Sequence, residues 1–114
     1  MTQGRILFGE LPRMTSEIIE GAIAVENDML VVGRTSDAEL RVAVDRHKAN
    51  IVIVGEGAVA ENLHLQLVGI HPHLKVVALT SGGGARVYEL RTLHLSDPSP
   101  AALLDLIRSV LQQA

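Results

Sequence analysis

The sequence predicts an α/β fold in which helices cover both faces of an open parallel sheet. Short apolar runs alternate with stretches of helical period along the chain, an order typical of βαβ units. The run at residues 50–54 is apolar without alternation, as expected of a strand that is covered on both faces. Two strand-like runs end at a glycine, Gly9 and Gly55, where open parallel sheets usually present their chemistry.

The first half of the chain contains two strand and helix pairs. A first strand is expected at residues 5–8 and an amphipathic helix at residues 14–25. The second strand is expected at residues 29–32. Ser36 and Glu39 then have the spacing of a capping box, which predicts that a second helix begins there.

The second half of the chain continues the alternation. The strand at residues 50–54 should be central, and a third helix fits residues 59–68. A fourth strand follows at residues 74–79. The last helix should begin at Ser99 and Pro100, because serine is a good N-cap and proline suits the first helical position.

Composition indicates one compact domain over residues 1–114. Hydrophobic residues make up 47% of the chain, enough for a core. Without a long apolar stretch or a signal peptide, we expect a cytoplasmic protein that does not associate with membranes. The absence of cysteine excludes disulfides, thiol catalysis and cysteine metal sites. The net charge of −3, without a block of like charge, argues against direct nucleic acid binding.

Five segments resemble the receiver domain of two-component response regulators, especially those joined to helix-turn-helix output domains. The resemblance covers nearly the whole chain and implies a flavodoxin-like, doubly wound, five-stranded parallel sheet with strand order 2-1-3-4-5. The first segment stands at the family's acidic pair, the next three match its second, third and fourth strands, and the last matches its fifth strand and lysine turn. These segments are GELP at 9–12, VVGRTSD at 31–37, ANIVIVG at 49–55, VALTS at 77–81 and LHLSDPSP at 93–100.

The phosphorylation pocket departs from that family. By this alignment, Gly55 stands at the phosphoacceptor aspartate, Gly9 at one of two metal-binding acids, and Ser96 at the lysine. Only Glu10 and Thr80 keep the residue types of the family. Phosphoryl transfer needs a carboxylate nucleophile and a cation, and Mg²⁺ typically takes carboxylate ligands. We therefore expect a degenerate pocket without a bound metal or cofactor.

Two neighbouring features could carry a negative charge or bind one. Glu56 follows Gly55 and could mimic a phosphate, but the alternation of side chains along a strand turns it the other way, which favours a solvated glutamate. The loop Ser81-Gly82-Gly83-Gly84 could form an anion-binding nest. Because it lacks the lysine and spacing of a Walker loop, a plain turn is the simpler interpretation.

Metal binding and catalysis have weaker support. The histidines His64, His71 and His73 could converge on a metal, but no carboxylate or cysteine joins them at ligand spacing. Surface histidines at a helix end explain them equally well. His94 is the only candidate base for a pocket hydroxyl, that of Ser96, and such hydroxyls commonly bond backbone groups. We expect neither a metal site nor an enzyme.

The segment between Thr80 and Ser96 is too short for the loop, helix and strand that receivers have there. Glycines open it, and alternation along residues 87–94 indicates extended chain. The family's fourth helix is therefore expected to be missing or reduced to a turn. In receivers, that helix and its flanking strands form the surface through which phosphorylation alters dimer contacts.

These observations predict a phosphorylation-independent pseudo-receiver that acts through protein–protein interaction, as the regulatory part of a longer transcriptional regulator or with another protein partner. A homodimer is expected, with interface candidates Val87, Tyr88, Leu90 and Leu93, although alternation must send half of them to the core. The alternative is a sensor that binds a small ligand or anion in the vacated pocket. Glu10 counts against an anion.

Overall fold

The computed structural model describes residues 3–90 and 99–112. Within these residues the chain forms one five-stranded sheet in the order β2-β1-β3-β4-β5. The α/β class, the strand order and the central place of β3 are as predicted. The expectation of a fully parallel sheet is wrong, because β5 runs antiparallel to β4. The strands are β1 Gly4–Phe8, β2 Met29–Arg34, β3 Ile51–Val54, β4 Lys75–Leu79 and β5 Ala85–Glu89.

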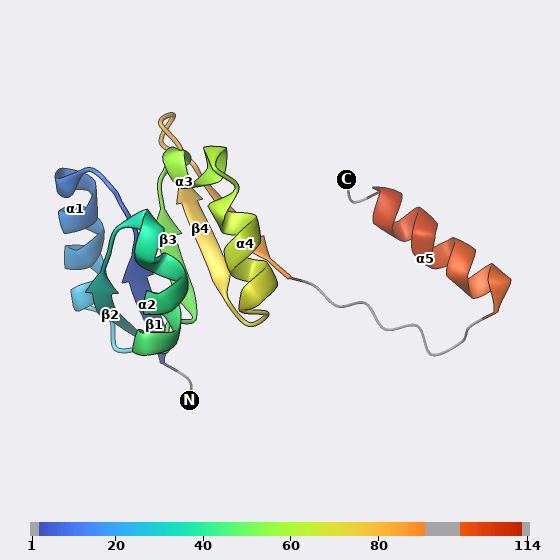
Figure 1. Cartoon of the computed structure of the whole chain (residues 1–114), viewed down its shortest axis with the longest axis horizontal. Helices are drawn as coiled ribbons and strands as arrows, with labels where there is room; N and C mark the ends of the chain where they lie inside the picture. The colour runs from blue at the N-terminus through green and yellow to red at the C-terminus, as the bar shows by residue number, and fades with distance from the viewer. Residues whose placement is uncertain (1–2, 91–98, 113–114) are drawn as a thin grey trace.

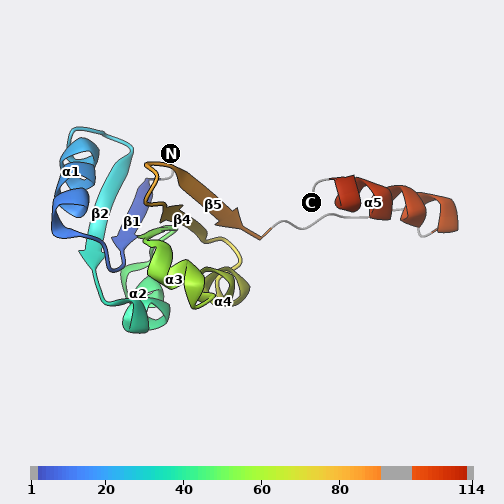
Figure 2. The same ribbon diagram turned by 90° about the horizontal axis from the view of Figure 1, so that it is seen from above.

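Helices lie on both faces of the sheet (Figures 1 and 2). α2, α3 and α4 pack on one face together with a large core cluster, and α1 packs on the other with a smaller cluster. None of the described helices is long and apolar enough to cross a membrane. The helices are α1 Arg13–Ala24, η1 Asp37–Glu39 (a 3₁₀ turn), α2 Leu40–His47, α3 Glu56–Ala60, α4 Leu63–Ile70 and α5 Pro100–Gln112.

Two local predictions are wrong in detail. The expected single helix at residues 59–68 is two helices, α3 and α4, separated at Asn62, which adopts a left-handed conformation with φ of 60°. Asparagine tolerates this region better than most residues. The capping box does not form either, because the Ser36 side chain makes no capping hydrogen bond and the 3₁₀ turn η1 precedes α2.

The chain reverses between β4 and β5 in a tight turn. The Thr80 amide donates to the Gly84 carbonyl at 2.9 Å, the Gly83 amide donates to the Thr80 carbonyl at 3.2 Å, and the Gly84 amide donates to Thr80 Oγ1 at 3.1 Å. Gly83 has a φ of 85°, which favours glycine. A parallel connection needs a crossover of about a dozen residues or more. Since only residues 80–84 separate the two strands, β5 must run antiparallel, and the family's helix between them is absent, as predicted.

The core forms two clusters because alternate side chains of each strand face opposite sides of the sheet. Leu7, Val52 and Val76 point to the side of α2, α3 and α4, where they are fully buried. Phe8 and Ile53 point to the side of α1. The larger cluster brings together the three helices and the centre of the sheet, so the sheet is held chiefly from that side.

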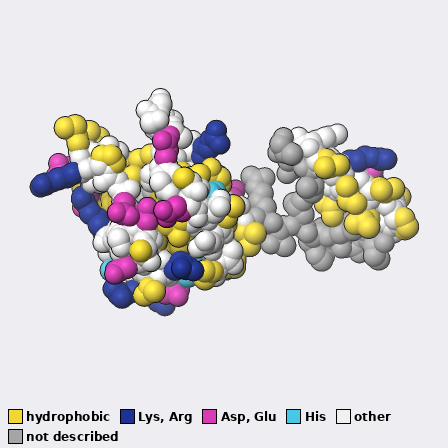
Figure 3. Space-filling model, turned by 45° about the horizontal axis from the view of Figure 1, so that its top comes forward, with side chains coloured by type: hydrophobic (Ala, Val, Ile, Leu, Met, Phe, Trp, Pro, Cys, Tyr) yellow, Lys and Arg dark blue, Asp and Glu magenta, His cyan; other side chains and the backbone are white. Residues whose placement is uncertain are grey.

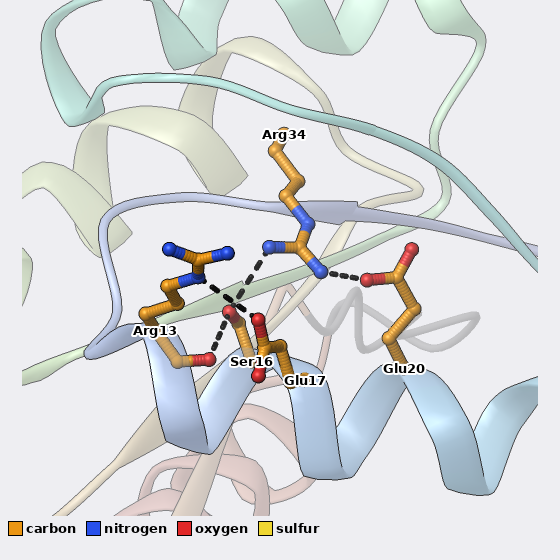
Figure 4. A network of polar contacts seen from close by, with 5 residues as sticks. All are labelled: Arg13, Ser16, Glu17, Glu20 and Arg34. Carbon is orange, nitrogen blue, oxygen red and sulfur yellow. Dashed lines mark hydrogen bonds and ion pairs between the residues drawn. The ribbon is translucent and has the colours of Figure 1, made fainter.

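Polar contacts fasten α1 to the edge of the sheet (Figure 4). Arg34, at the end of β2, forms an ion pair with Glu20 and donates to Ser16 Oγ at 3.1 Å. Its guanidinium also lies 5.7 Å from the ring centroid of Phe8. Ser16 in turn donates to the Arg13 carbonyl at 3.0 Å. These contacts keep α1 over the β2 side of its face.

α5 stands apart from the sheet in both ribbon views (Figures 1 and 2). The radius of gyration is 16.7 Å, whereas a compact domain of this length would have about 13 Å. Its start is as predicted, because the Ala102 amide donates to Ser99 Oγ at 3.3 Å. The exposed fractions of its large apolar side chains lie between 45% and 68%; these are Leu103, Leu104, Ile107 and Leu111.

The turn generates a test of the antiparallel hairpin. Gly83→Ala should lower the free energy of unfolding by about 1 kcal/mol, because a left-handed backbone conformation is less favourable for alanine than for glycine. Gly82→Ala is the matched control, since Gly82 lacks a positive φ and a Cβ there meets open space. Urea unfolding of both variants measures the difference, and equal stabilities would count against this turn.

Candidate functional site

The carboxyl ends of the parallel strands bring the predicted pocket residues to one edge of the sheet. Gly9 follows β1, Gly55 follows β3 and Thr80 follows β4, and these three strands are neighbours. The Gly9 amide donates to the Ile53 carbonyl at 2.9 Å, which continues the pairing of β1 with β3. Glu10 lies beside Gly9, whereas Ser96 lies outside the described residues.

The space beside Gly9 is already filled. A Cβ at Gly9 would lie 2.7 Å from Asp37 Oδ1 and 3.1 Å from carbon atoms of Leu40 and Val54. Asp37 Oδ1 accepts from the Glu10 amide at 2.9 Å, and Glu10 Oε2 accepts from the Asp37 amide at 3.1 Å. This reciprocal pair joins the end of β1 to the start of η1. The glycine therefore makes room for Asp37 and leaves no vacancy for a ligand.

Sequence reasoning missed Asp37 as a residue of this edge. It lies in the turn after β2, and β2 is the neighbour of β1 in the sheet. That strand order was itself expected, so the turn after the second strand was the available signal. What the order alone does not give is which oxygen in that turn meets which amide.

An acidic groove of about 430 Å³ opens between η1 and the helices after β3. Three carboxylates, those of Glu10, Asp37 and Glu61, line it together with the guanidinium of Arg41. Figure 3, in which this edge of the sheet comes forward, shows acidic side chains gathered on the body. Two of these carboxylates already accept backbone amides, and the described residues include no group of three ligands placed to hold a metal.

Gly55 is open on its pocket side. A Cβ there would lie 3.5 Å from the Glu10 carbonyl oxygen and 3.6 Å from Leu11 Cδ2, both ordinary contacts. A second groove of about 490 Å³, the hairpin groove, adjoins it. Glu56 is the one charged residue among those that line it: Leu11, Pro12, Thr15, Gly55, Glu56, Leu79, Thr80, Ser81, Gly83 and Gly84.

Glu56 is exposed, as expected of a solvated glutamate, but it turns toward the β4–β5 turn and not the other way. Its Oε1 accepts from the Ser81 amide at 2.8 Å. The alternation rule fails because β3 ends at Val54 and Glu56 is already the first residue of α3. The carboxylate thus binds a backbone amide at the end of the neighbouring strand. A charge-assisted hydrogen bond of this kind is stronger than one between neutral groups.

Three backbone amides of the loop 81–84 already donate hydrogen bonds within the protein. The Ser81 amide donates to Glu56, the Gly83 amide to the Thr80 carbonyl, and the Gly84 amide to Thr80 Oγ1. An anion that bound the amides of Ser81, Gly83 or Gly84 would have to displace those acceptors, and it would lie close to the Glu56 carboxylate. The geometry therefore favours a structural turn over an anion-binding nest.

The three candidate histidines do not converge. His64 is buried, with 6% of its surface exposed, and its ring lies 4.2 Å from that of Tyr88. It is a core residue, so the interpretation of a surface histidine is wrong for this position. His71 Nδ1 lies 3.6 Å from Asp45 Oδ1, and His73 is exposed. The Nδ1 atom of His64 is buried without a hydrogen-bond partner among the described residues.

The interface candidates divide between the two faces of β5. Val87 and Leu90 are 60% and 50% exposed. Tyr88 points to the opposite face from Val87 and packs against the larger core cluster. Leu93 lies outside the described residues. Of the described candidates, Val87 and Leu90 are therefore available to a partner.

The two glycines should respond differently to alanine. Gly9→Ala must displace Asp37 and break its bond to the Glu10 amide, so we expect a loss of about 1–3 kcal/mol in the free energy of unfolding. Gly55→Ala should change it by less than about 1 kcal/mol, since the added methyl meets only ordinary contacts. Urea denaturation measures the free energy of unfolding of both variants. An equal loss in the two would contradict the finding that the space beside Gly9 is filled.

The bond from Ser81 to Glu56 should be visible in amide hydrogen exchange. Glu56→Ala removes the acceptor, so the Ser81 amide should exchange faster, while stability falls by about 1 kcal/mol or less because the site is exposed. Glu61→Ala removes an exposed carboxylate from the acidic groove and serves as the control. Unchanged exchange at Ser81 in Glu56→Ala would show that the bond does not protect this amide.

Taken as a whole, the edge offers carboxylates and hydroxyls with little positive charge. Among the described residues that line its two grooves, Arg41 is the only cation. Three backbone amides of the edge, those of Glu10, Asp37 and Ser81, are held by side-chain carboxylates. No family model matches the chain, and no curated protein matches it.

Proposed function

We propose that this chain is a phosphorylation-independent pseudo-receiver, a signalling domain that acts through protein–protein interaction. One observation carries the proposal: at the end of the central strand, where an open sheet presents its chemistry, stands the bare backbone of Gly55, and the adjacent carboxylate of Glu56 is bound to the Ser81 amide. Among the described residues, no free carboxylate thus stands at the centre of the edge, while the strand order 2-1-3-4-5 supports the likeness to receivers.

The charge distribution supports the same proposal. Phosphoryl transfer requires cations or donors that offset the charge on the transferred group. At this edge, the carboxylates of Glu10 and Asp37 each accept a hydrogen bond from the other residue's backbone amide. The carboxylate of Glu56 adds a third negative charge next to Gly55, whose pocket side is open. A phosphoryl donor would therefore approach negative charge without a described lysine beside the hairpin groove.

The hydrogen bond of Glu56 would hold the carboxyl edge in a single conformation. In receivers, the hydroxyl residue of the fourth strand contacts the phosphoryl group. Here, a permanent carboxylate already joins the start of α3 to the turn after β4, at 2.8 Å. The state of the domain would then be set by what it binds and not by modification.

The proposed partner is a protein. Exposed apolar side chains occur on several described elements, and those of β5 and α5 lie away from the carboxyl edge: Val87, Leu90 and the stripe on α5. In line with the resemblance, the domain would act in the cytoplasm as the regulatory part of a transcriptional regulator whose output domain lies outside this sequence. It would neither contact DNA itself nor catalyse a reaction.

A small-ligand sensor has less support. The hairpin groove of about 490 Å³ is large enough for a small molecule. Its charged lining residue is Glu56, which disfavours an anion, and the loop amides beside it are already bonded. Its other polar side chains are the hydroxyls of Thr15, Thr80 and Ser81, and that of Thr80 already accepts from the Gly84 amide.

The proposal is tested by exposing the chain to acetyl phosphate and Mg²⁺. Intact-mass spectrometry should show no phosphoryl adduct, and the sedimentation profile should not change, because no free carboxylate stands at the centre of the edge. A receiver with an intact pocket, treated alongside, shows that the donor is active. A hydroxylamine-sensitive adduct that is lost in Glu56→Gln or Asp37→Asn would overturn the proposal.

A further inference from the structure

One half of a sheet face has no helix over it among the described elements. Ile53, Val77 and Val87 form a row across β3, β4 and β5, on the side of α1. Ile53 is 8% exposed, Val77 is half-buried and Val87 is 60% exposed. The burial of these three side chains therefore decreases with distance from α1. We call the outer part of this surface, formed by Val77, Leu79 and Val87, the bare face.

The bare face arises from where α1 is held. The ion pair and the hydrogen bond of Arg34 hold α1 over β2, which is the edge strand opposite β5. The other three helices of the body lie on the opposite face. An apolar sheet surface of this kind is normally packed against another element.

α5 carries the complementary surface. Leu103, Leu104, Ile107 and Leu111 recur at the spacing of one helical face and are all exposed. Figure 3 shows hydrophobic side chains gathered on the visible side of this helix. The polar residues Asp105, Arg108 and Gln112 fall on the other side. An isolated helix of 13 residues is marginal in water, so its stability must come from packing.

α5 and the strands β4 and β5 are similar in length. A helix of this length spans about 20 Å, and the five-residue strands β4 and β5 span about 17 Å. The helix can thus lie along both strands, over the bare face and over the Lys75–Glu89 ion pair at the other end of the same side.

We propose that α5 of one copy docks on the bare face of a second copy, so that two chains exchange these helices in a symmetric dimer. This inference deepens the proposed interaction function, on which it rests, by naming the partner and the segment that binds it. Because β5 is antiparallel, the chain leaves the sheet from its outermost strand, at the end opposite the carboxyl edge. α5 then stands away from its own sheet (Figures 1 and 2), and a two-fold exchange fills both bare faces at once.

The absence of cysteine makes a direct crosslinking test possible. One chain carries Val87→Cys and a second, tagged chain carries Ile107→Cys, and the two are co-expressed and oxidised. The exchange predicts a disulfide between the two different chains on a non-reducing gel. Gln112→Cys, on the polar side of α5, replaces Ile107→Cys in the control and should crosslink at least about tenfold less.

Three results would overturn the exchange. Crosslinking confined within the double variant Val87→Cys/Ile107→Cys would show that α5 covers the bare face of its own chain. A disulfide between two Val87→Cys chains without one to Ile107→Cys would show pairing of sheet edges. No crosslink in any combination would show that α5 does not reach this face.

Sedimentation equilibrium gives a second measurement that does not depend on the cysteines. Ile107→Ala should raise the dimer dissociation constant by about tenfold or more, because each dimer loses the burial of two side chains. Gln112→Ala should leave it unchanged. A monomer at all concentrations in the unmodified chain would refute the exchange and leave the result with acetyl phosphate untouched, so failure of the dimer and failure of the pseudo-receiver function are distinguishable.

Discussion

The turn from Thr80 to Gly84 is the constraint on which the rest of the structure depends. Thr80 closes it with its carbonyl, its amide and its hydroxyl, and Gly83 supplies the backbone conformation. By reversing the chain at once, the turn removes the helix that would follow β4 in a receiver. It also makes β5 an antiparallel edge strand whose end lies far from the carboxyl edge. The exposed outer surface of the sheet and the separate α5 both follow from this reversal.

The same turn is tied to the central strand by a carboxylate. Glu56 binds the Ser81 amide, just as Asp37 and Glu10 bind each other's amides at the neighbouring strand end. Each bond uses negative charge to hold backbone where a switchable domain would keep charge available for Mg²⁺ and phosphate. These carboxylates therefore have a structural role, because they connect neighbouring segments of the backbone. One oxygen of each of these carboxylates holds a backbone amide, and the proposed function assigns contact with other molecules to the apolar side chains of β5 and α5.

Much of the fold was predictable because apolar periodicity and turn residues act locally. The first four strands, α1 and the start of α5 followed from such signals, and the strand order followed from the resemblance to receivers. The direction of β5 was missed because the fifth strand was assigned to residues 93–100, although the glycines after Thr80 and the short connection already required a hairpin. Asp37, Glu56 and His64 were missed or misjudged because their roles depend on packing between distant segments. For Glu56, a helix begins directly after the strand, so the alternation rule did not apply.

The central proposal is that this edge does not receive a phosphoryl group, because the amides of Glu10, Asp37 and Ser81 are already bonded to its carboxylates. The most direct measurement follows the backbone amide signals of Glu10, Gly55 and Ser81 by NMR while Mg²⁺ and beryllofluoride are added. The account predicts that all three signals stay in place at saturating concentrations of both. Saturable shifts of these signals that require both Mg²⁺ and beryllofluoride would contradict it and would identify a functional acceptor at the edge.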